Sequence, residues 1–163
     1  MLLFALQETQ DHGARIAAVL GTELSELEHR DFGDGEYKIR PLCPVRGAHV
    51  CVIQSLYSDT DLSVHDKLCR LLFLIATMRD HGAIRVTALV PYLAYGRKDR
   101  RTKSQDPLST RYLAQLFEAV SCDDLITFEV HNPAAFENAF RLGTHHLELG
   151  QVFQNVITWR TEN

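Results

Sequence analysis

Residues 64–93 read VHDKLCRLLFLIATMRDHGAIRVTALVPYL, and this stretch carries two hydrophobic patterns in succession. The first has the spacing of an α-helix and predicts one buried face made of Leu68, Leu71, Leu72, Ile75 and Met78. Gly82 follows where such a helix would end, because glycine readily closes a helix C-terminus. The second pattern, IRVTALVPYL, is a short β-branched run and predicts a buried strand. A helix leading into a buried strand is typical of an α/β fold.

The same alternation extends toward the N-terminus. Leu2–Leu6 predicts a first strand, and the following segment DHGARIAAVLG predicts a helix. Three apolar residues of that helix recur at helical spacing and a glycine stops it; these are Ile16, Val19, Leu20 and Gly21. The segment EHRDFGDGEYKIRP has a turn signal at Asp34-Gly35 and predicts a strand pair, while HVCVIQSL predicts another buried strand.

Toward the C-terminus, PLSTRYLAQLFEAVSC predicts a helix and DLITFEV predicts a strand. The tail NVITWRTEN contains the apolar VITW, which indicates either the start of another element or a boundary at which a longer chain was cut. Short buried strands that alternate with helices predict an α/β domain with a mostly parallel sheet flanked by helices and joined by right-handed crossovers.

Length and composition limit the class of protein. The 163 residues suit one domain with a real core, and the formal net charge of -4 provides no global basic field for nucleic acid. The sequence contains no run of eighteen apolar residues that would predict a membrane span, and the N-terminus lacks the pattern of a signal peptide.

Four cysteines are widely spaced without a CxxC pair, which indicates the reduced, mostly packed thiols of a cytoplasmic protein; these are Cys43, Cys51, Cys69 and Cys122.

Cations gather in one place despite the acidic balance. Five of the 17 Lys and Arg residues lie in GRKDRRTK, residues 96–103, directly after a predicted strand. In an open α/β sheet, ligands bind beyond the carboxyl ends of the strands, and Arg forks together with a helix begun near Pro107 or Leu108 would suit a phosphate. A solvated loop and a nucleic-acid contact remain alternatives, although the segment lacks the interleaved aromatics that the latter would use.

Several motifs in order resemble the N-terminal half of ribose-phosphate pyrophosphokinase, also called phosphoribosyl pyrophosphate synthase. PYLAYGRKDR resembles the family's PYxxYxRQDR strand exit, KSQDPLS its K-S-x-x-P-[IL]-[ST] helix start, and EVH its D-L-H strand end. RDFGDGEYKIRP resembles an earlier F-x-[DN]-x-E segment, and HVCVIQSL resembles VYIIQS. The resemblance covers roughly Arg30 to Phe140.

The resemblance implies a fold, a reaction and roles for particular residues. The family has two phosphoribosyltransferase-like α/β domains, assembles into homo-oligomers, and transfers the β,γ-diphosphoryl group of Mg-ATP to the 1-hydroxyl of ribose 5-phosphate. By position, Arg97 matches a contact to the ATP phosphates, with Asp99 in the same stretch, and His131 matches a histidine at the Mg²⁺ site. Residues that match an adenine contact from a neighbouring subunit are Phe32, Asp34 and Glu36. Residues that match a regulatory phosphate contact are Lys103 and Ser104.

Some positions depart from the family's pattern. Lys98 replaces a neutral amide, so it either strengthens anion binding or points to solvent, and Glu129 replaces an aspartate. Arg141 stands where a later aspartate is expected, so no metal ligand is assigned there, and the adjacent His145 and His146 are expected to face solvent.

The largest departure concerns the sugar phosphate. The family's second domain has a DDxxx[ST]xGT loop that holds ribose 5-phosphate, and no such pattern occurs in residues 1–163. We therefore expect the chain to be the single N-terminal, ATP-side domain, catalytically incomplete without the C-terminal ribose-phosphate-binding domain. The alternative is a non-catalytic, half-length family member that regulates a full-length synthase by subunit association.

Overall fold

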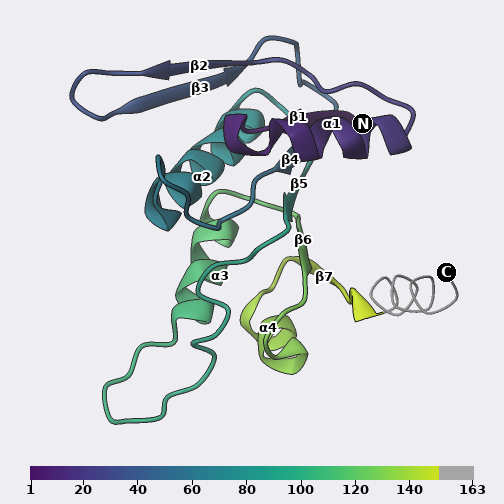
Figure 1. Cartoon of the computed structure of the whole chain (residues 1–163). Coiled ribbons are helices and arrows are strands. Elements are labelled where there is room, and N and C mark those ends of the chain that lie inside the picture. Colours follow the sequence, from purple (N-terminus) through teal and green to yellow (C-terminus); the bar gives the residue numbers. More distant parts are fainter. Residues whose placement is uncertain (151–163) are drawn as a thin grey trace, which may run out of the picture.

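Five parallel strands form the central sheet of the computed structural model, which describes residues 1–150 (Figure 1). The strand order is β1-β4-β5-β6-β7, and each neighbouring pair is parallel. The strands are β1 (Leu2–Ala5), β4 (His49–Ile53), β5 (Arg85–Val90), β6 (Asp124–Phe128) and β7 (Gly143–Leu147). This confirms the predicted α/β class with a mostly parallel sheet. The predicted element in NVITWRTEN lies outside the described residues.

The larger part of the core lies between one face of the sheet and three helices. These helices are α2 (Val64–Asp80), α3 (Ser109–Ala119) and α4 (Pro133–Ala139). All five apolar residues predicted for the buried face of α2 are less than 10% exposed; they are Leu68, Leu71, Leu72, Ile75 and Met78. They join alternate residues of the strands, such as Val52, Val86 and Leu125, in one continuous cluster. The side chains that recur at helical spacing in α2 and those at every second position of the strands thus pack in the same layer.

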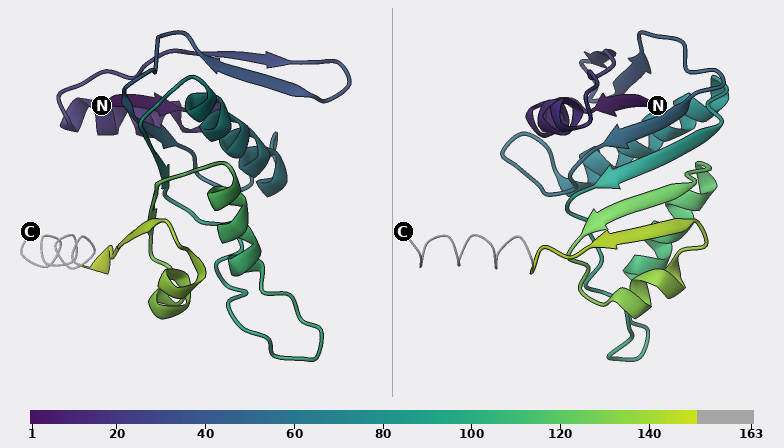
Figure 2. Two further views of the ribbon diagram at one scale, coloured as in Figure 1. Left: turned by 180° about the vertical axis from the view of Figure 1, so that it is seen from behind. Right: turned by 90° about the vertical axis from the view of Figure 1, so that its right-hand side faces the viewer.

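The opposite face of the sheet carries α1 (Gln10–Val19), which follows a short 3-10 turn, η1 (Gln7–Thr9) (Figure 2). The predicted helix exists, but its predicted apolar face is partly wrong: Val19 is 88% exposed and Leu20 is 55% exposed. The helix instead approaches the sheet through Gly13 and Ala17. A Cβ at Gly13 would lie 2.6 Å from the Cβ of Ala5, so even alanine would clash and the close contact requires glycine.

A two-stranded antiparallel hairpin projects beyond the β1 edge of the sheet (Figures 1 and 2). Its strands are β2 (Leu27–Asp31) and β3 (Tyr37–Pro41), and the turn between them contains Asp34-Gly35 as predicted. Gly35 has φ +90°, a conformation that glycine adopts without strain. The hairpin contacts α2 through Arg70, whose guanidinium lies 3.7 Å from the centre of the Tyr37 ring.

All four cysteines are free thiols, as predicted. Burial raises the pKa of Cys51 to about 11 and that of Cys122 to about 12, so both are protonated and unreactive at neutral pH. Cys43 is half-buried, whereas Cys69 is exposed on α2 and is not a packed thiol. Within residues 1–150, no helix has both the length and the apolarity needed to cross a bilayer.

Candidate functional site

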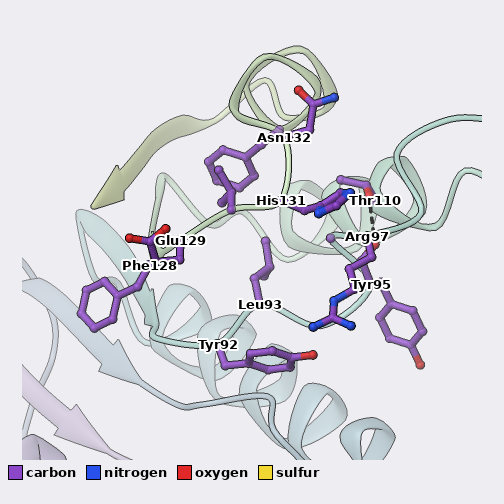
Figure 3. A pocket seen from close by; sticks show the side chains of 12 residues that line it. Tyr92, Leu93, Tyr95, Arg97, Thr110, Phe128, Glu129, His131 and Asn132 are labelled. Carbon is purple, nitrogen blue, oxygen red and sulfur yellow. Dashed lines mark hydrogen bonds between the residues drawn. The ribbon is translucent and has the colours of Figure 1, made fainter. Parts of the chain in front are cut away.

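A cavity of about 240 Å³ opens at the edge of the sheet where β5 and β6 end (Figure 3). Its wall is formed by the segment that follows β5, the first turn of α3, the segment that follows β6, and α4. Arg97 and His131 both line this cavity, although they are far apart in the sequence. Because parallel strands end at a common edge, the loops after β5 and β6 place both side chains on the wall of one cavity.

The path of the chain after β5 directs Arg97 into the cavity. Tyr95 has φ +63°, an unusual conformation for a bulky residue, and its phenol points away from the cavity to hydrogen-bond with Nδ1 of His65 at 2.8 Å (Figure 3). The hydroxyl of Thr110 holds this turn by donating to the carbonyl oxygens of Tyr95 at 2.9 Å and of Lys98 at 3.2 Å. The guanidinium of Arg97 then points toward Tyr92.

The N-terminus of α3 is already hydrogen-bonded to this turn. The backbone amide of Thr110 donates to the carbonyl of Lys98 at 3.3 Å. That amide is therefore not available to an anion. The N-terminus of α3 thus contributes less to phosphate binding than the sequence suggested. Thr110 acts on the site indirectly, by fixing the loop that carries Arg97.

The segment after β6 places His131 between two fixed residues. Glu129 has φ +46°, its amide donates to the carbonyl of Leu147 at 3.2 Å, and its carboxylate accepts from the amide of Leu149 at 2.5 Å. Asn132 caps α4, since its Oδ1 accepts from the amide of Ala135 at 3.2 Å. The backbone is thus held on both sides of His131.

Lys98 does not line the cavity, and its ammonium is paired rather than free in solvent, so the expectation of a side chain that simply points to solvent is wrong. Its ammonium donates to Oδ2 of Asp106 at 2.7 Å, across a loop that spans residues 97–106. The same oxygen accepts from the amide of Thr102 at 2.9 Å, from its hydroxyl at 2.7 Å and from the amide of Lys103 at 2.9 Å. The hydrogen bond from Lys98 and these further donors hold the pKa of Asp106 well below its usual range. Asp106 therefore holds together the loop of residues 97–106, which we call the basic loop.

The other predicted site residues lie outside the cavity. Asp99 does not line it, but its Oδ2 accepts from Nδ2 of the lining residue Asn132 at 2.8 Å. Lys103 and Ser104 are exposed on the basic loop. The predicted adenine contacts occupy the turn of the β2–β3 hairpin and none of them lines the cavity; they are Phe32, Asp34 and Glu36. In this turn the carboxylate of Asp34 accepts from the amide of Glu36 at 3.1 Å.

Sequence reasoning missed Tyr92, Thr110 and Asn132 as residues of this site. Tyr92 is 40% exposed and packs edge-on against Tyr57, with ring centroids 5.5 Å apart, at the rim of the cavity. The available signal for Tyr92 was a tyrosine near the carboxyl end of the predicted strand IRVTALVPYL. For Thr110 and Asn132 there was no such signal, because their roles depend on the path of the loops.

A sequence model described as the N-terminal domain of ribose phosphate pyrophosphokinase matches residues 1–120. The chain belongs to this family. It contains the predicted strand exit, helix start and hairpin within the matched residues, which confirms the resemblance seen in the sequence, and the family is one of enzymes.

Relatives named ribose-phosphate pyrophosphokinase share the family's sequence features at moderate identity. The protein from Ureaplasma parvum is 33% identical over 132 residues, which cover 81% of this chain and 39% of the relative. Ribose-phosphate pyrophosphokinase 1 from Streptococcus pneumoniae is 30% identical over 145 residues, which cover 89% of this chain and 44% of the relative. The chain therefore spans less than half the length of these two curated relatives.

The fold also matches a solved member of the family. The crystal structure of phosphoribosylpyrophosphate synthetase from Mycobacterium smegmatis superimposes with a TM-score of 0.88 at 24% identity, over 96% of this chain and 51% of that one. This likeness confirms the predicted architecture of the ribose phosphate pyrophosphokinase domain.

The side chains at the cavity do not build a magnesium cage. Among the described residues, no three His, Cys, Asp or Glu side chains gather closely enough to hold a metal ion. The carboxylates nearest His131 are engaged elsewhere, Glu129 with the amide of Leu149 and Asp99 with Asn132. Since Mg²⁺ prefers oxygen ligands and water, these residues fit an ion carried by nucleotide phosphates better than one held by protein alone.

The two adjacent histidines that were expected to face solvent, His145 and His146, differ in exposure. His145 is exposed on β7, with Nε2 3.9 Å from Oδ1 of Asp124. His146 points to the other face of the strand and is only 20% exposed, so the expectation of a solvent-facing side chain is wrong for it. Neither lies at the cavity that holds His131.

Proposed function

We propose that this chain is the nucleotide-side, N-terminal domain of a ribose-phosphate pyrophosphokinase and binds Mg-ATP in the cavity of Arg97 and His131. The observation that carries the proposal is that a guanidinium and an imidazole line one cavity at the carboxyl edge of a parallel sheet. The reaction would transfer a diphosphoryl group to ribose 5-phosphate and release AMP. In this proposal the protein is cytoplasmic and acts as a homo-oligomer.

The chemistry asks for alignment and for neutralisation of charge. The anomeric hydroxyl oxygen of ribose 5-phosphate attacks the β-phosphorus, and the bond from that phosphorus to the α–β bridging oxygen breaks. The bridging oxygen leaves as part of AMP, and the proton of the hydroxyl passes to solvent. Arg97 would engage two phosphate oxygens through its planar donors, and His131 would donate a hydrogen bond to another phosphate oxygen. Mg²⁺ bound to the phosphates would supply further neutralisation of their charge.

The acceptor sugar would be held by residues that do not belong to this cavity. Alignment of two reactants accounts for about 7 to 11 kcal/mol of the barrier in well-oriented reactions, so a site that binds only one reactant is a poor catalyst. We expect the chain alone to bind Mg-ATP without appreciable turnover, and to need a ribose-phosphate-binding domain for activity.

Isothermal titration calorimetry with Mg-ATP tests the nucleotide site. Arg97→Ala should weaken binding by about tenfold or more, because a charge-assisted contact to phosphate is lost. Arg100→Ala is the matched control, since Arg100 is an exposed arginine of the same loop that does not line the cavity. Equal affinity of the wild type and Arg97→Ala would count against the phosphate role.

A second candidate is a half-length family member that regulates a complete synthase by subunit association. The chain spans 39% of one relative and 44% of another. A measurement of AMP release from Mg-ATP and ribose 5-phosphate distinguishes the catalytic proposal from the regulatory one. The catalytic proposal expects release when a separately expressed C-terminal domain is added. The regulatory one expects no release then, but altered turnover of an added full-length synthase.

A further inference from the structure

We propose that Asp99 and Asn132 are positioning residues, whose hydrogen bond joins the segment after β5 to the segment after β6 and fixes Arg97 and His131 relative to each other. Nδ2 of Asn132 donates to Oδ2 of Asp99 at 2.8 Å, although the two residues are 33 positions apart in the sequence. Asp99 lies two residues after Arg97, and Asn132 directly follows His131. The effect of this contact on nucleotide affinity rests on the proposed function, whereas its effect on the loop does not.

Asn132 presents its amide donor in a fixed direction. Its Oδ1 accepts from the amide of Ala135 at 3.2 Å, and its carbonyl accepts from the amide of Phe136 at 3.0 Å, so the residue is tied to the first turn of α4. Both side-chain atoms are thus used, the oxygen inward on the helix and the nitrogen outward toward the basic loop. An asparagine can perform both tasks because it carries an acceptor and a donor.

Asp99 sits on a loop that is held at its two ends. Thr110 binds the carbonyls of Tyr95 and Lys98, and Asp106 gathers donors from the far end of the loop. Between these two anchors, the hydrogen bond to Asn132 joins the loop to the segment after β6. The other contacts between the two walls lie further from Arg97 and His131 in the sequence, such as the packing of Phe117 on α3 against Phe140 after α4.

The charge of Asp99 also favours this role over direct contact with phosphate. A carboxylate beside a triphosphate would be repelled by it, and like charges within a few ångströms are unfavourable. A carboxylate that accepts from Asn132 instead uses its charge to strengthen a protein contact. A cavity whose cationic and imidazole groups are fixed in advance binds an anion without the entropy loss of ordering them.

Exchanging the amide of Asn132 and the carboxylate of Asp99 tests the hydrogen bond between these two residues. Asn132→Asp keeps the acceptor that caps α4 but removes the donor and places a second carboxylate against Asp99. We expect it to weaken Mg-ATP binding by about tenfold. The double variant Asp99→Asn/Asn132→Asp restores donor and acceptor in reversed order and should recover affinity to within about threefold of the wild type. No recovery in the double variant would overturn the inference.

Trypsin cleavage without nucleotide provides a second measurement that is independent of ATP binding. The basic loop contains Lys and Arg at positions 97, 98, 100, 101 and 103, and a loop released from Asn132 should be cut faster. We expect faster cleavage in Asn132→Asp and in Asn132→Ser, which keeps the cap and adds no charge, and wild-type cleavage in the double variant. Wild-type cleavage rates in both single variants would refute the positioning role.

The two measurements also separate this inference from the proposed function. If Arg97→Ala leaves Mg-ATP affinity unchanged while Asn132→Asp loosens the loop and the double variant tightens it, the nucleotide role fails and the contact stands. If Arg97→Ala weakens binding and the exchange changes neither affinity nor cleavage, the nucleotide role stands and the contact fails. Thermal unfolding midpoints near that of the wild type establish that each variant is folded.

Discussion

Lys67 is a buried cation that the structure pairs on two sides. It lies in the first turn of α2 with a side chain only 5% exposed, and its ammonium donates to the carbonyl of Tyr57 at 2.6 Å and to Oδ2 of Asp59 at 2.5 Å. Burial of an ammonium is unfavourable unless the charge is paired and hydrogen-bonded. The loop that contains Tyr57 and Asp59 is therefore tied to the helix by this one residue.

This pair predicts a dependence of stability on acid pH. The hydrogen bond from Lys67, followed by those from the amides of Leu62 and Asp61, lowers the pKa of Asp59 from 3.8 to about 2. A depressed carboxyl pKa stabilises the folded state at pH values above the unfolded pKa, and this contribution is lost as the pH falls from about 4 to about 2. Asp59→Asn should thus lower the free energy of unfolding most above pH 4, with the difference from the wild type shrinking toward pH 2.

Urea unfolding of the wild type and the variant between pH 2 and pH 6 measures this difference. Asp61→Asn is the control for removal of one negative charge from the same loop, because its carboxylate accepts from the hydroxyl of Thr60 rather than from a cation. We expect a smaller loss of stability in the control. A difference between Asp59→Asn and the wild type that stays constant across this range would contradict the assigned cause.

Single residues of the site differ in how far the sequence could predict them. Arg97 was predictable, because a cation directly after a buried strand of a parallel sheet must lie at the carboxyl edge. The role of Lys98 was not, since its partner Asp106 is reached only when the loop folds back over eight residues. The bond between Asp99 and Asn132 joins segments that have no common sequence pattern.

At the scale of elements, the strength of the periodic signal decides what could be predicted. The 17 residues of α2 carry a strong helical repeat, and the structure confirms it. By contrast, α4 has seven residues and β7 reads GTHHL, without a β-branched apolar run, and neither was predicted. In β7 the pairing with β6 supplies the strand structure, so tertiary contacts outweigh local propensity.

Arg70 helps to attach the β2–β3 hairpin to the rest of the fold, alongside the apolar packing of Ile39 in the core. Besides the contact with the ring of Tyr37, the guanidinium of Arg70 lies 2.9 Å from Oδ1 of Asp31 and 3.4 Å from Oε1 of Glu8. The side chain of Arg70 is only 14% exposed. A planar guanidinium can stack on a ring and bind two carboxylates at once, which a lysine cannot reproduce. The hairpin is therefore fixed to both α2 and η1 by Arg70.

Arg70→Ala should loosen the hairpin without disrupting the sheet. We expect amide hydrogen exchange in β2 and β3 to become faster by about tenfold, with little change in β4 and β5, and a loss of about 1 to 2 kcal/mol in unfolding free energy. Lys38→Ala is the matched control on the same hairpin, because the ion pair of Lys38 with Glu28 is exposed. Unchanged exchange in β2 and β3 would show that other contacts hold this element.

At the scale of the whole molecule, two groups of predicted nucleotide contacts lie at opposite ends of the fold. The hairpin projects beyond the β1 edge, whereas the cavity lies between the ends of β5 and β6 (Figures 1 and 2). In this structure Phe32 does not line the cavity that contains Arg97 of the same chain. If both residues contact the same ATP molecule, the hairpin of a second copy must reach the cavity, which requires association of the chain.

Mixing of variants tests this arrangement in solution. Phe32→Ala and Arg97→Ala should each weaken Mg-ATP binding, because each removes one half of every shared site. A mixture of the two variants should recover sites of wild-type affinity, since an intact hairpin then meets an intact cavity in mixed assemblies. Phe32 is 37% exposed and lies outside the core, so its loss should leave the fold unchanged. Calorimetry of the mixture, with sedimentation velocity to report association, measures both effects.

The matched control is a mixture of Phe32→Ala with Asp34→Ala, in which every hairpin is defective and no intact site can form. Recovery in the first mixture but not in the second requires that the two groups come from different copies. If Phe32→Ala alone binds Mg-ATP as the wild type does, the hairpin takes no part in the site. If both variants bind weakly and neither mixture recovers, the defects lie within one chain, and the separation of the hairpin from the cavity would have to close by movement of the hairpin.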